Sequence, residues 1–312
     1  MVISNENNND TNYQNILQGK LTNAFHMLSE QSFHFDRFSN NANAIVNNVK
    51  FSADGINSLP TPFKFDTVVQ LIFDIFILKL TPSLPYKKEM VDRDFKKYQQ
   101  VSITLKEYMN LCNIKSNKTR AIEQLRTALN IIGHISVEFS DTHFIRKNKS
   151  ESAYYLFRIT DTVIRDKSTG TYSIVFNVNF LKYLSKTYLM PFHLELFKIN
   201  LKLHSHAYQL ARRLLLHHNM NFSKSNANII SVRILLESIN IPTYEQVKHK
   251  GRQIKQLIIQ PLELNMNYLQ QINFLEWNYT SDINYSYQKW IDSSIQFKIF
   301  NYPAREKLIK IQ

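Results

Sequence analysis

Residues 104–133, TLKEYMNLCNIKSNKTRAIEQLRTALNIIG, carry the pattern that decides the fold of this chain. Thr104 and Glu107 have the T-x-x-E spacing of a capping box, in which two side chains satisfy free backbone N–H groups at a helix start. We expect a helix to about residue 113, a polar turn over residues 115–117, and a second helix over residues 118–132, with Gly133 ending it. This order indicates a helix-turn-helix.

The flanking segments extend this motif to a winged helix. Residues 66–80 repeat apolar side chains at helical spacing, and residues 101–103 suit a short strand. After the motif, residues 135–139, 154–159 and 172–178 alternate apolar and polar side chains, as half-buried strands do. The basic link between the first two of these strands is interpreted as the wing tip, with Arg146, Lys147 and Lys149 as phosphate contacts.

A second stretch repeats the same order of elements. Residues 203–218 suit a helix, and Ser231 can cap another that runs to residue 238. Thr243 and Gln246 form a second capping box, and the helix that follows should be kinked or ended by Pro261. Residues 272–279 and 295–300 close the unit as strands.

The predicted fold class is therefore α+β: two tandem winged-helix domains, each a helix-turn-helix with a small antiparallel sheet. The expected organisation is a flexible Asn-rich arm over residues 1–58, domains over residues 59–188 and 189–302, and a tail over residues 303–312.

Charge indicates a polyanionic partner. The chain has 38 Lys and Arg against 25 Asp and Glu, a formal net charge of +13 with a pI near 9.6. Residues 1–62 hold three basic and five acidic side chains, so the remainder carries +15. A Lys- and Asn-rich composition accounts for part of this excess, but a folded region this basic favours nucleic acid.

The second helix of each motif should enter the major groove of DNA, where Arg and Lys pair with guanine and Gln or Asn with adenine. The candidate DNA-binding residues are Lys115, Asn117, Lys118, Arg120 and Gln124 in the first copy, and Lys248, Lys250, Arg252, Gln253, Lys255 and Gln256 in the second. A solvated helix face is the alternative for any one of them.

The residues give little support to an enzyme, a metal site or a membrane protein. Cys112 is the only cysteine, and no G-x-x-x-x-G-K phosphate loop is present. His204, His206 and Tyr208 suggest a metal-dependent nickase, but that chemistry needs both histidines on one side of a strand, and we expect a helix there. We expect no cofactor, no metal, no membrane span and a cytoplasmic location.

Several runs resemble the iteron-binding plasmid replication initiators. SHAYQLARRL (residues 205–214) is similar to the first helix of their C-terminal winged helix, and RQIKQLIIQPLELN (residues 252–265) to a basic helix with an internal proline. INFLEWNY (residues 272–279) is similar to the strand that follows, and residues 102–139 to the N-terminal helix-turn-helix.

The resemblance implies a non-enzymatic initiator that binds repeated origin sequences in double-stranded DNA, helps to open the duplex and recruits a host helicase or initiator proteins. It also implies a homodimer in equilibrium with monomer, joined mainly through the N-terminal winged helix and repressing its own gene. A tandem winged-helix transcriptional regulator remains the alternative, followed by the nickase.

Overall fold

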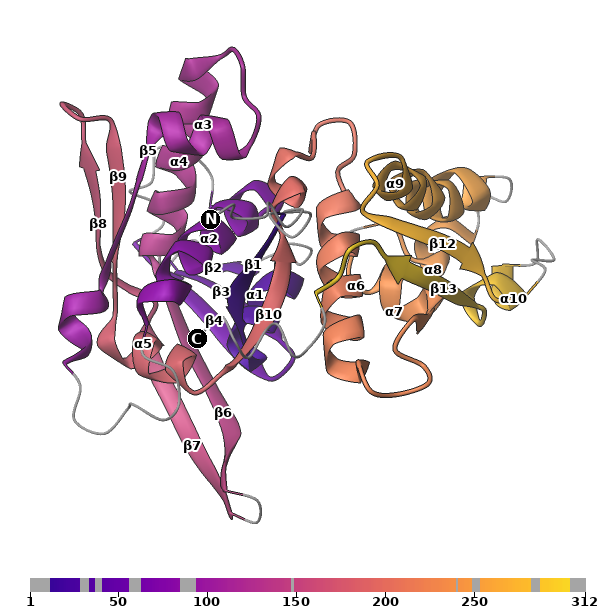
Figure 1. The fold of residues 1–312 in the computed structure, drawn as a ribbon, viewed down its shortest axis with the longest axis horizontal. Helices are drawn as coiled ribbons and strands as arrows, with labels where there is room; N and C mark the ends of the chain where they lie inside the picture. Colours follow the sequence, from indigo (N-terminus) through magenta and orange to yellow (C-terminus); the bar gives the residue numbers. More distant parts are fainter. Residues whose placement is uncertain are drawn as a thin grey trace, which may run out of the picture. The chain divides into compact units, whose positions relative to one another are not determined.

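The computed structural model describes residues 12–28, 34–36, 41–55, 63–84, 94–146, 149–239, 241–248, 253–281 and 287–303. The chain divides into two compact units. Figure 1 shows the fold, with colours that follow the sequence. The N-terminal unit is Ile16–Leu189, and the C-terminal unit combines Met190–Gln312 with Met1–Asn15. Strands β1 (Tyr13–Gln18) and β10 (Tyr188–His193) pair with each other, and the division falls within both.

The N-terminal unit contains a winged helix. Its elements in chain order are α2 (Thr67–Leu80), β5 (Gln100–Thr104), α3 (Leu105–Leu111), α4 (Lys118–Gly133), β8 (Thr160–Asp166) and β9 (Thr171–Phe176). The sheet order is β5-β9-β8, with both pairings antiparallel. Short turns η2 (Thr81–Ser83) and η3 (Phe95–Tyr98) and helix α5 (Val178–Ser185) complete the connections.

Local capping explains where these helices begin. The Asp66 carboxylate accepts from the Val68 and Val69 N–H groups at 3.0 Å at the start of α2. At α3 the capping box is confirmed, since the Glu107 N–H donates to Thr104 Oγ1 at 3.2 Å and the reciprocal bond is present. The last helical residue of α4 is Gly133, but the residue does not take a positive φ, and its Cα lies against Val163 of β8 instead.

Residues 13–54 differ from the weakly ordered arm that their composition predicts. They form β1, α1 (Lys20–Leu28), β2 (His34–Asp36), β3 (Asn41–Val46) and β4 (Val49–Asp54). Asn47 and Asn48 form the turn between β3 and β4, both with positive φ, a conformation that asparagine tolerates in two-residue hairpins. Phe25 and Phe51 are fully buried with ring centroids 4.9 Å apart, so this segment belongs to the core.

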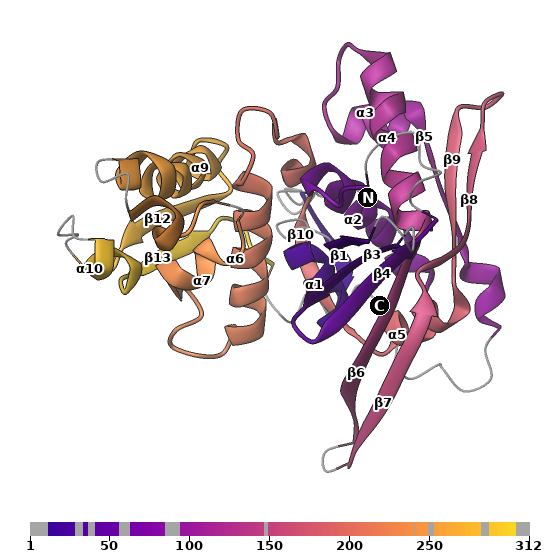
Figure 2. The same cartoon turned by 180° about the vertical axis from the view of Figure 1, so that it is seen from behind.

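Strands β2, β3 and β4 of this segment are part of a second sheet. The order of this sheet is β2-β3-β4-β6-β7, where β6 is Ile135–Arg146 and β7 is Lys149–Arg158. Val49 lies opposite Phe139 in the β4–β6 pairing, so the partner strand is far away in sequence. Figure 2 shows β3 and β4 beside β6, and Figure 1 shows β6 and β7 as a long ribbon.

The C-terminal unit repeats the winged-helix order. Its elements are η4 (Leu194–Lys198), α6 (Ala207–Asn221), β11 (Ile229–Ser231), α7 (Val232–Leu236), α8 (Tyr244–Val247), the π-helical turn η6 (Lys255–Ile259), α9 (Gln260–Gln271), β12 (Leu275–Tyr279), α10 (Tyr287–Ile291) and β13 (Ser294–Ile299). The sheet order β11-β13-β12 matches β5-β9-β8 when the strands are numbered within each unit. The chain is therefore α+β, with two tandem winged-helix domains.

The structure corrects one local expectation in this unit and excludes one of the two alternatives, a kink or an end, for the helix at Pro261. Helix α6 begins at Ala207, and residues 203–206 form a turn. Pro261 does not end its helix, because the backbone takes a π-helical turn in which the Gln260 N–H bonds to the Lys255 carbonyl, and α9 continues to Gln271. A π turn suits this position since proline cannot donate to the carbonyl four residues earlier.

Candidate nucleic-acid interface

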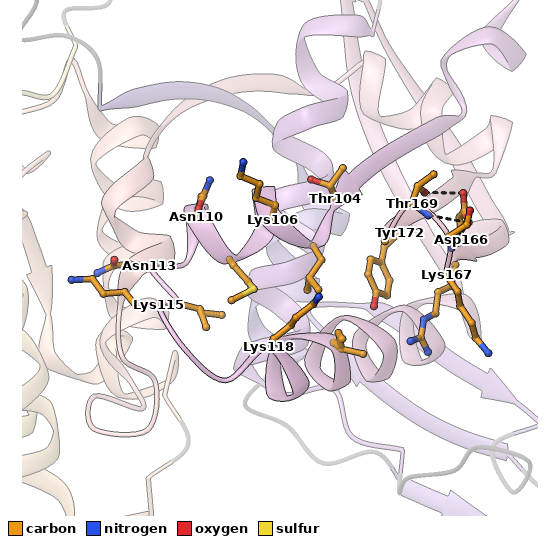
Figure 3. A pocket seen from close by; sticks show the side chains of 17 residues that line it. Thr104, Lys106, Asn110, Asn113, Lys115, Lys118, Asp166, Lys167, Thr169 and Tyr172 are labelled. Carbon is orange, nitrogen blue, oxygen red and sulfur yellow. Dashed lines mark hydrogen bonds between the residues drawn. The ribbon is translucent and has the colours of Figure 1, made fainter.

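A groove in the N-terminal unit lies between the helix-turn-helix and the β8–β9 hairpin. It has a volume of about 1100 Å³ and is lined by residues of α3, the turn after it, the start of α4 and the hairpin tip. Figure 3 shows Lys106 and Asn110 on α3, Lys118 at the start of α4, and Asp166 to Thr169 across the opening. This hairpin is the wing of the domain, because β9 pairs with β5.

The groove is strongly basic. Its lining contains five cations, Lys106, Lys115, Lys118, Arg165 and Lys167, against one carboxylate, Asp166. Within the part of the chain that the structure describes, none of the five is in an ion pair. The Arg165 guanidinium lies 5.7 Å from the centre of the Tyr172 ring, its cross-strand partner. Unpaired cations on one concave surface attract a polyanion such as a nucleic-acid backbone.

The structure places the expected residues of the first copy in different environments. Lys115 and Lys118 line the groove, and Arg120 is exposed in the first turn of α4. Asn117 has φ of 68° and caps α4, since its side chain accepts from the Arg120 N–H at 3.1 Å. Gln124 is half-buried and accepts from the Tyr108 hydroxyl at 3.1 Å. Asn117 and Gln124 therefore have structural partners within the motif.

The residues expected at the wing tip do not belong to the β8–β9 hairpin. Arg146 and Lys149 are paired at the end of the β6–β7 ribbon, which belongs to the second sheet, and Lys147 lies outside the described residues. The sequence analysis missed Arg165, Lys167 and Lys106. A signal for the true wing was present in Asp166-Lys-Ser-Thr-Gly170, which has the turn-forming residues of a hairpin between two alternating runs.

In the C-terminal unit, Lys248, Gln253, Lys255 and Gln256 are exposed. Lys248 pairs with Glu245 on α8, which raises the pKa of the lysine. The Thr243 N–H donates to Gln246 Oε1 at 2.9 Å, so the second capping box is confirmed. Lys250 and Arg252 lie outside the described residues.

The burial of Tyr208 argues against the nickase interpretation. This tyrosine is fully buried in α6, where its hydroxyl has no access to a phosphodiester. His204 and His206 lie in the turn before α6 rather than on a strand, and the His204 ring stacks on Tyr268 at 3.6 Å. Among the described residues, no group of three or more His, Cys, Asp or Glu is arranged to hold a metal ion.

No helix in the described ranges has the length and apolar character needed to span a membrane.

Two copies of the same helix, strand, helix, helix and hairpin order define a tandem winged-helix protein of the helix-turn-helix class. Residues 56–210 match the family described as initiator replication protein, WH1, so this stretch of the chain is similar to that family of replication initiators. A search of curated proteins gives no match.

Solved structures with a similar course of chain include domains 2 and 3 of RctB, with 11% identity and a TM-score of 0.47, covering 89% of this chain and 98% of that one. The Pi initiator protein in complex with iteron DNA has 16% identity and a TM-score of 0.44, covering 80% of this chain and 96% of that one. The WH1 domain of MSBI1.176, a replication protein isolated from a multiple sclerosis patient, has 12% identity and a TM-score of 0.21, covering 39% of this chain and 82% of that domain.

Proposed function

We propose that this initiator is plasmid-encoded and binds repeated origin sequences in double-stranded DNA through both winged-helix domains. In this proposal it performs no catalytic step. It helps to open the duplex, recruits host replication proteins and represses its own gene. The observation that carries the proposal is a groove with five cations, none in an ion pair with a described residue, beside the helix-turn-helix of a domain that matches replication initiators.

The proposed binding mode follows from the positions of the charges. Helix α4 would enter the major groove with Lys118 and Arg120 toward the bases, while Lys106 on α3 and Lys167 at the wing tip meet phosphates. In the C-terminal domain, the segment Lys248 to Gln256 would read a second stretch of the site. We assign the sequence-reading role there to Arg252, since arginine can pair with guanine through two hydrogen bonds.

Footprinting on the DNA that flanks the gene tests this function. We expect protection of direct repeats, because two modules together cover about two helical turns. Random protection at low salt only, or none at all, would contradict specific origin binding. A plasmid that carries the repeats but not the gene should then replicate only when the protein is supplied. Specific binding without any replication would make the chain a transcriptional regulator.

We further propose that the dimer forms through the second sheet of the N-terminal unit. Ile45, Leu156 and Tyr154 lie on one face of this sheet and are 69%, 66% and 63% exposed. Cross-strand pairing places Ile45, Lys50, Glu138 and Leu156 in one row, with Lys50 and Glu138 in an ion pair at 2.9 Å. This row, with an apolar side chain at each end and one cation and one anion between them, is complementary to a second copy of itself across a twofold axis.

Sedimentation of the full chain tests this interface. Leu156→Glu should shift the equilibrium toward monomer, because a carboxylate would be buried against an apolar surface. Leu203→Glu, which changes a residue 72% exposed in the C-terminal unit, is the matched control and should leave the equilibrium unchanged. Equal dissociation constants for Leu156→Glu and the unsubstituted protein would place the interface elsewhere.

A further inference from the structure

The one carboxylate in the basic groove is unexpected for a surface that meets phosphates. Asp166 lies at the end of β8, flanked by Arg165 and Lys167, and lines the groove with them. A negative charge here repels a DNA backbone and therefore lowers affinity unless it has another role.

Asp166 accepts several hydrogen bonds within the wing tip. Its Oδ1 accepts from the Ser168 N–H at 2.9 Å and from the Ser168 hydroxyl at 2.6 Å. Its Oδ2 accepts from the Thr169 hydroxyl at 2.7 Å, and Figure 3 shows Thr169 beside Asp166 at the wing tip. Together these hydrogen bonds close residues 166–169 into a turn that points the Lys167 side chain away from the carboxylate (Figure 3).

This turn is connected directly to the helix-turn-helix. Gly170 follows it with φ of +65°, a conformation that glycine adopts without strain. In that conformation the Gly170 carbonyl accepts from the N–H of Leu105, the first residue of α3, at 2.9 Å. This N–H has no acceptor within its own helix, so the wing tip satisfies a group that the helix start leaves free.

We propose that Asp166 is a positioning residue of the DNA-binding groove, which holds the wing tip against α3 and thereby fixes Arg165 and Lys167 relative to α4. This inference rests on the proposed function. Its consequence is that the carboxylate increases affinity for a specific site although its charge repels phosphates. A wing held in one conformation loses less conformational entropy on binding than a mobile one.

The charge itself persists at every pH at which binding is measured. Hydrogen bonds from Ser168 and Thr169 lower the pKa of Asp166 to about 2, because they stabilise the ionised form. If the carboxylate only repels phosphates, its removal should raise DNA affinity. If it positions the wing, its removal should lower DNA affinity.

The test compares Asp166→Ala, Asp166→Asn and the unsubstituted protein on the footprinted duplex and on a scrambled duplex of equal composition. Positioning predicts that Asp166→Ala loses about tenfold in affinity for the specific duplex, the size of one lost directional contact, and also binds the scrambled duplex more weakly, because Lys167 is assigned to phosphates that both duplexes present. Asp166→Asn should fall between, since its amide oxygen can still accept from Ser168. Charge repulsion alone predicts tighter binding of both duplexes by both variants, and that result would overturn the proposal.

Asp161 provides the matched control. It lies on the same strand outside the groove lining and accepts from Gln99 at 2.8 Å and from Asn177 at 2.7 Å. Asp161→Asn makes the same change in net charge and should leave specific affinity within about twofold, as expected for a change remote from the binding surface. A loss equal to that of Asp166→Asn would show that net charge or stability, not the wing, is responsible.

Amide hydrogen exchange gives a readout that does not depend on DNA. Asp166→Ala should speed exchange of the Leu105 amide while the amides of β5 and β9 keep their protection. Unchanged Leu105 exchange would contradict the positioning role. Failure of the unsubstituted protein to bind any flanking duplex would instead contradict the proposed function, so the two failures are distinguishable.

Discussion

The hydroxyl of Tyr108 donates to Gln124 Oε1 at 3.1 Å and so ties the two helices of the first helix-turn-helix together. Tyr108 is 2% exposed, and burial raises the pKa of its phenol, so the hydroxyl remains protonated. The bond joins α3 to α4 behind the groove and leaves the Gln124 amide oxygen occupied.

This pair predicts that Gln124 contributes to stability rather than to base recognition. Gln124→Ala should lower the free energy of unfolding by about 1 kcal/mol, because it leaves a buried hydroxyl without its acceptor. Tyr108→Phe removes the donor, and the double variant should cost less than the sum of the two single changes. Urea unfolding of the unsubstituted protein, the two single variants and the double variant measures this double-mutant cycle. Strict additivity, or a changed ratio of specific to scrambled DNA affinity for Gln124→Ala, would contradict this assignment.

Asn117 gives a prediction about the start of α4. Asn117→Ala should lower the free energy of unfolding by about 2 kcal/mol, since it removes the cap and leaves alanine in the left-handed region, which alanine tolerates less well than asparagine does. Asn117→Gly should cost only a few tenths of a kcal/mol, because glycine adopts positive φ freely and is itself tolerated at a cap. The two variants are compared by urea unfolding. Equal losses would mean that the φ of 68° is not retained in solution.

The groove cations predict a steep salt dependence of DNA affinity. With six or more phosphate contacts, affinity should fall on the order of a thousandfold between about 50 and 200 mM salt. Lys106→Ala and Lys167→Ala should each reduce the slope of log affinity against log salt by about one. Lys198→Ala, which removes a cation paired with Glu195 in the other unit, is the control. A flat dependence for the unsubstituted protein is incompatible with a phosphate-binding groove.

Cys112 should be chemically inert. Burial raises the pKa of its thiol to about 12, so at pH 8 the reactive thiolate is about a thousandfold scarcer than at an ordinary cysteine. A thiol reagent should therefore label the native protein slowly and the urea-unfolded protein at once. Cys112→Ser should keep DNA affinity within a few fold. Rapid labelling of the folded protein, or a loss of binding that zinc restores, would contradict this prediction.

Helices of the DNA-binding motifs could be predicted because their signals are local. The capping boxes at Thr104 and Thr243 and the start of α4 at Lys118 depend on residues three or four positions apart, and all three are present in the structure. The fold class followed from repeating this local order twice. The positions of Lys115 and Lys118 in the groove follow from the same local signals, since the turn and the helix start define where they lie.

The wing and the arm could not be predicted, because strand pairing is decided at long range. An alternating run shows that a strand has an apolar face but does not specify its neighbour. The sequence therefore allowed the ribbon ending at Arg146 and Lys149 to be taken as the wing, whereas β9 pairs with β5 and places Arg165 and Lys167 at the groove. It also gave no sign that Val49 of the Asn-rich segment would lie opposite Phe139.

By itself, then, the amino-acid sequence determined two helix-turn-helix motifs, their helix starts and the basic character of the folded region. Only the tertiary structure decided which hairpin forms the wing, that Asn117 and Gln124 are engaged within the motif, and that Asp166 links the wing to α3 through Gly170. The physical reason is the range of the interactions: capping and helical periodicity act within one turn of the chain, whereas strand pairing and burial join residues that meet only when the chain has folded.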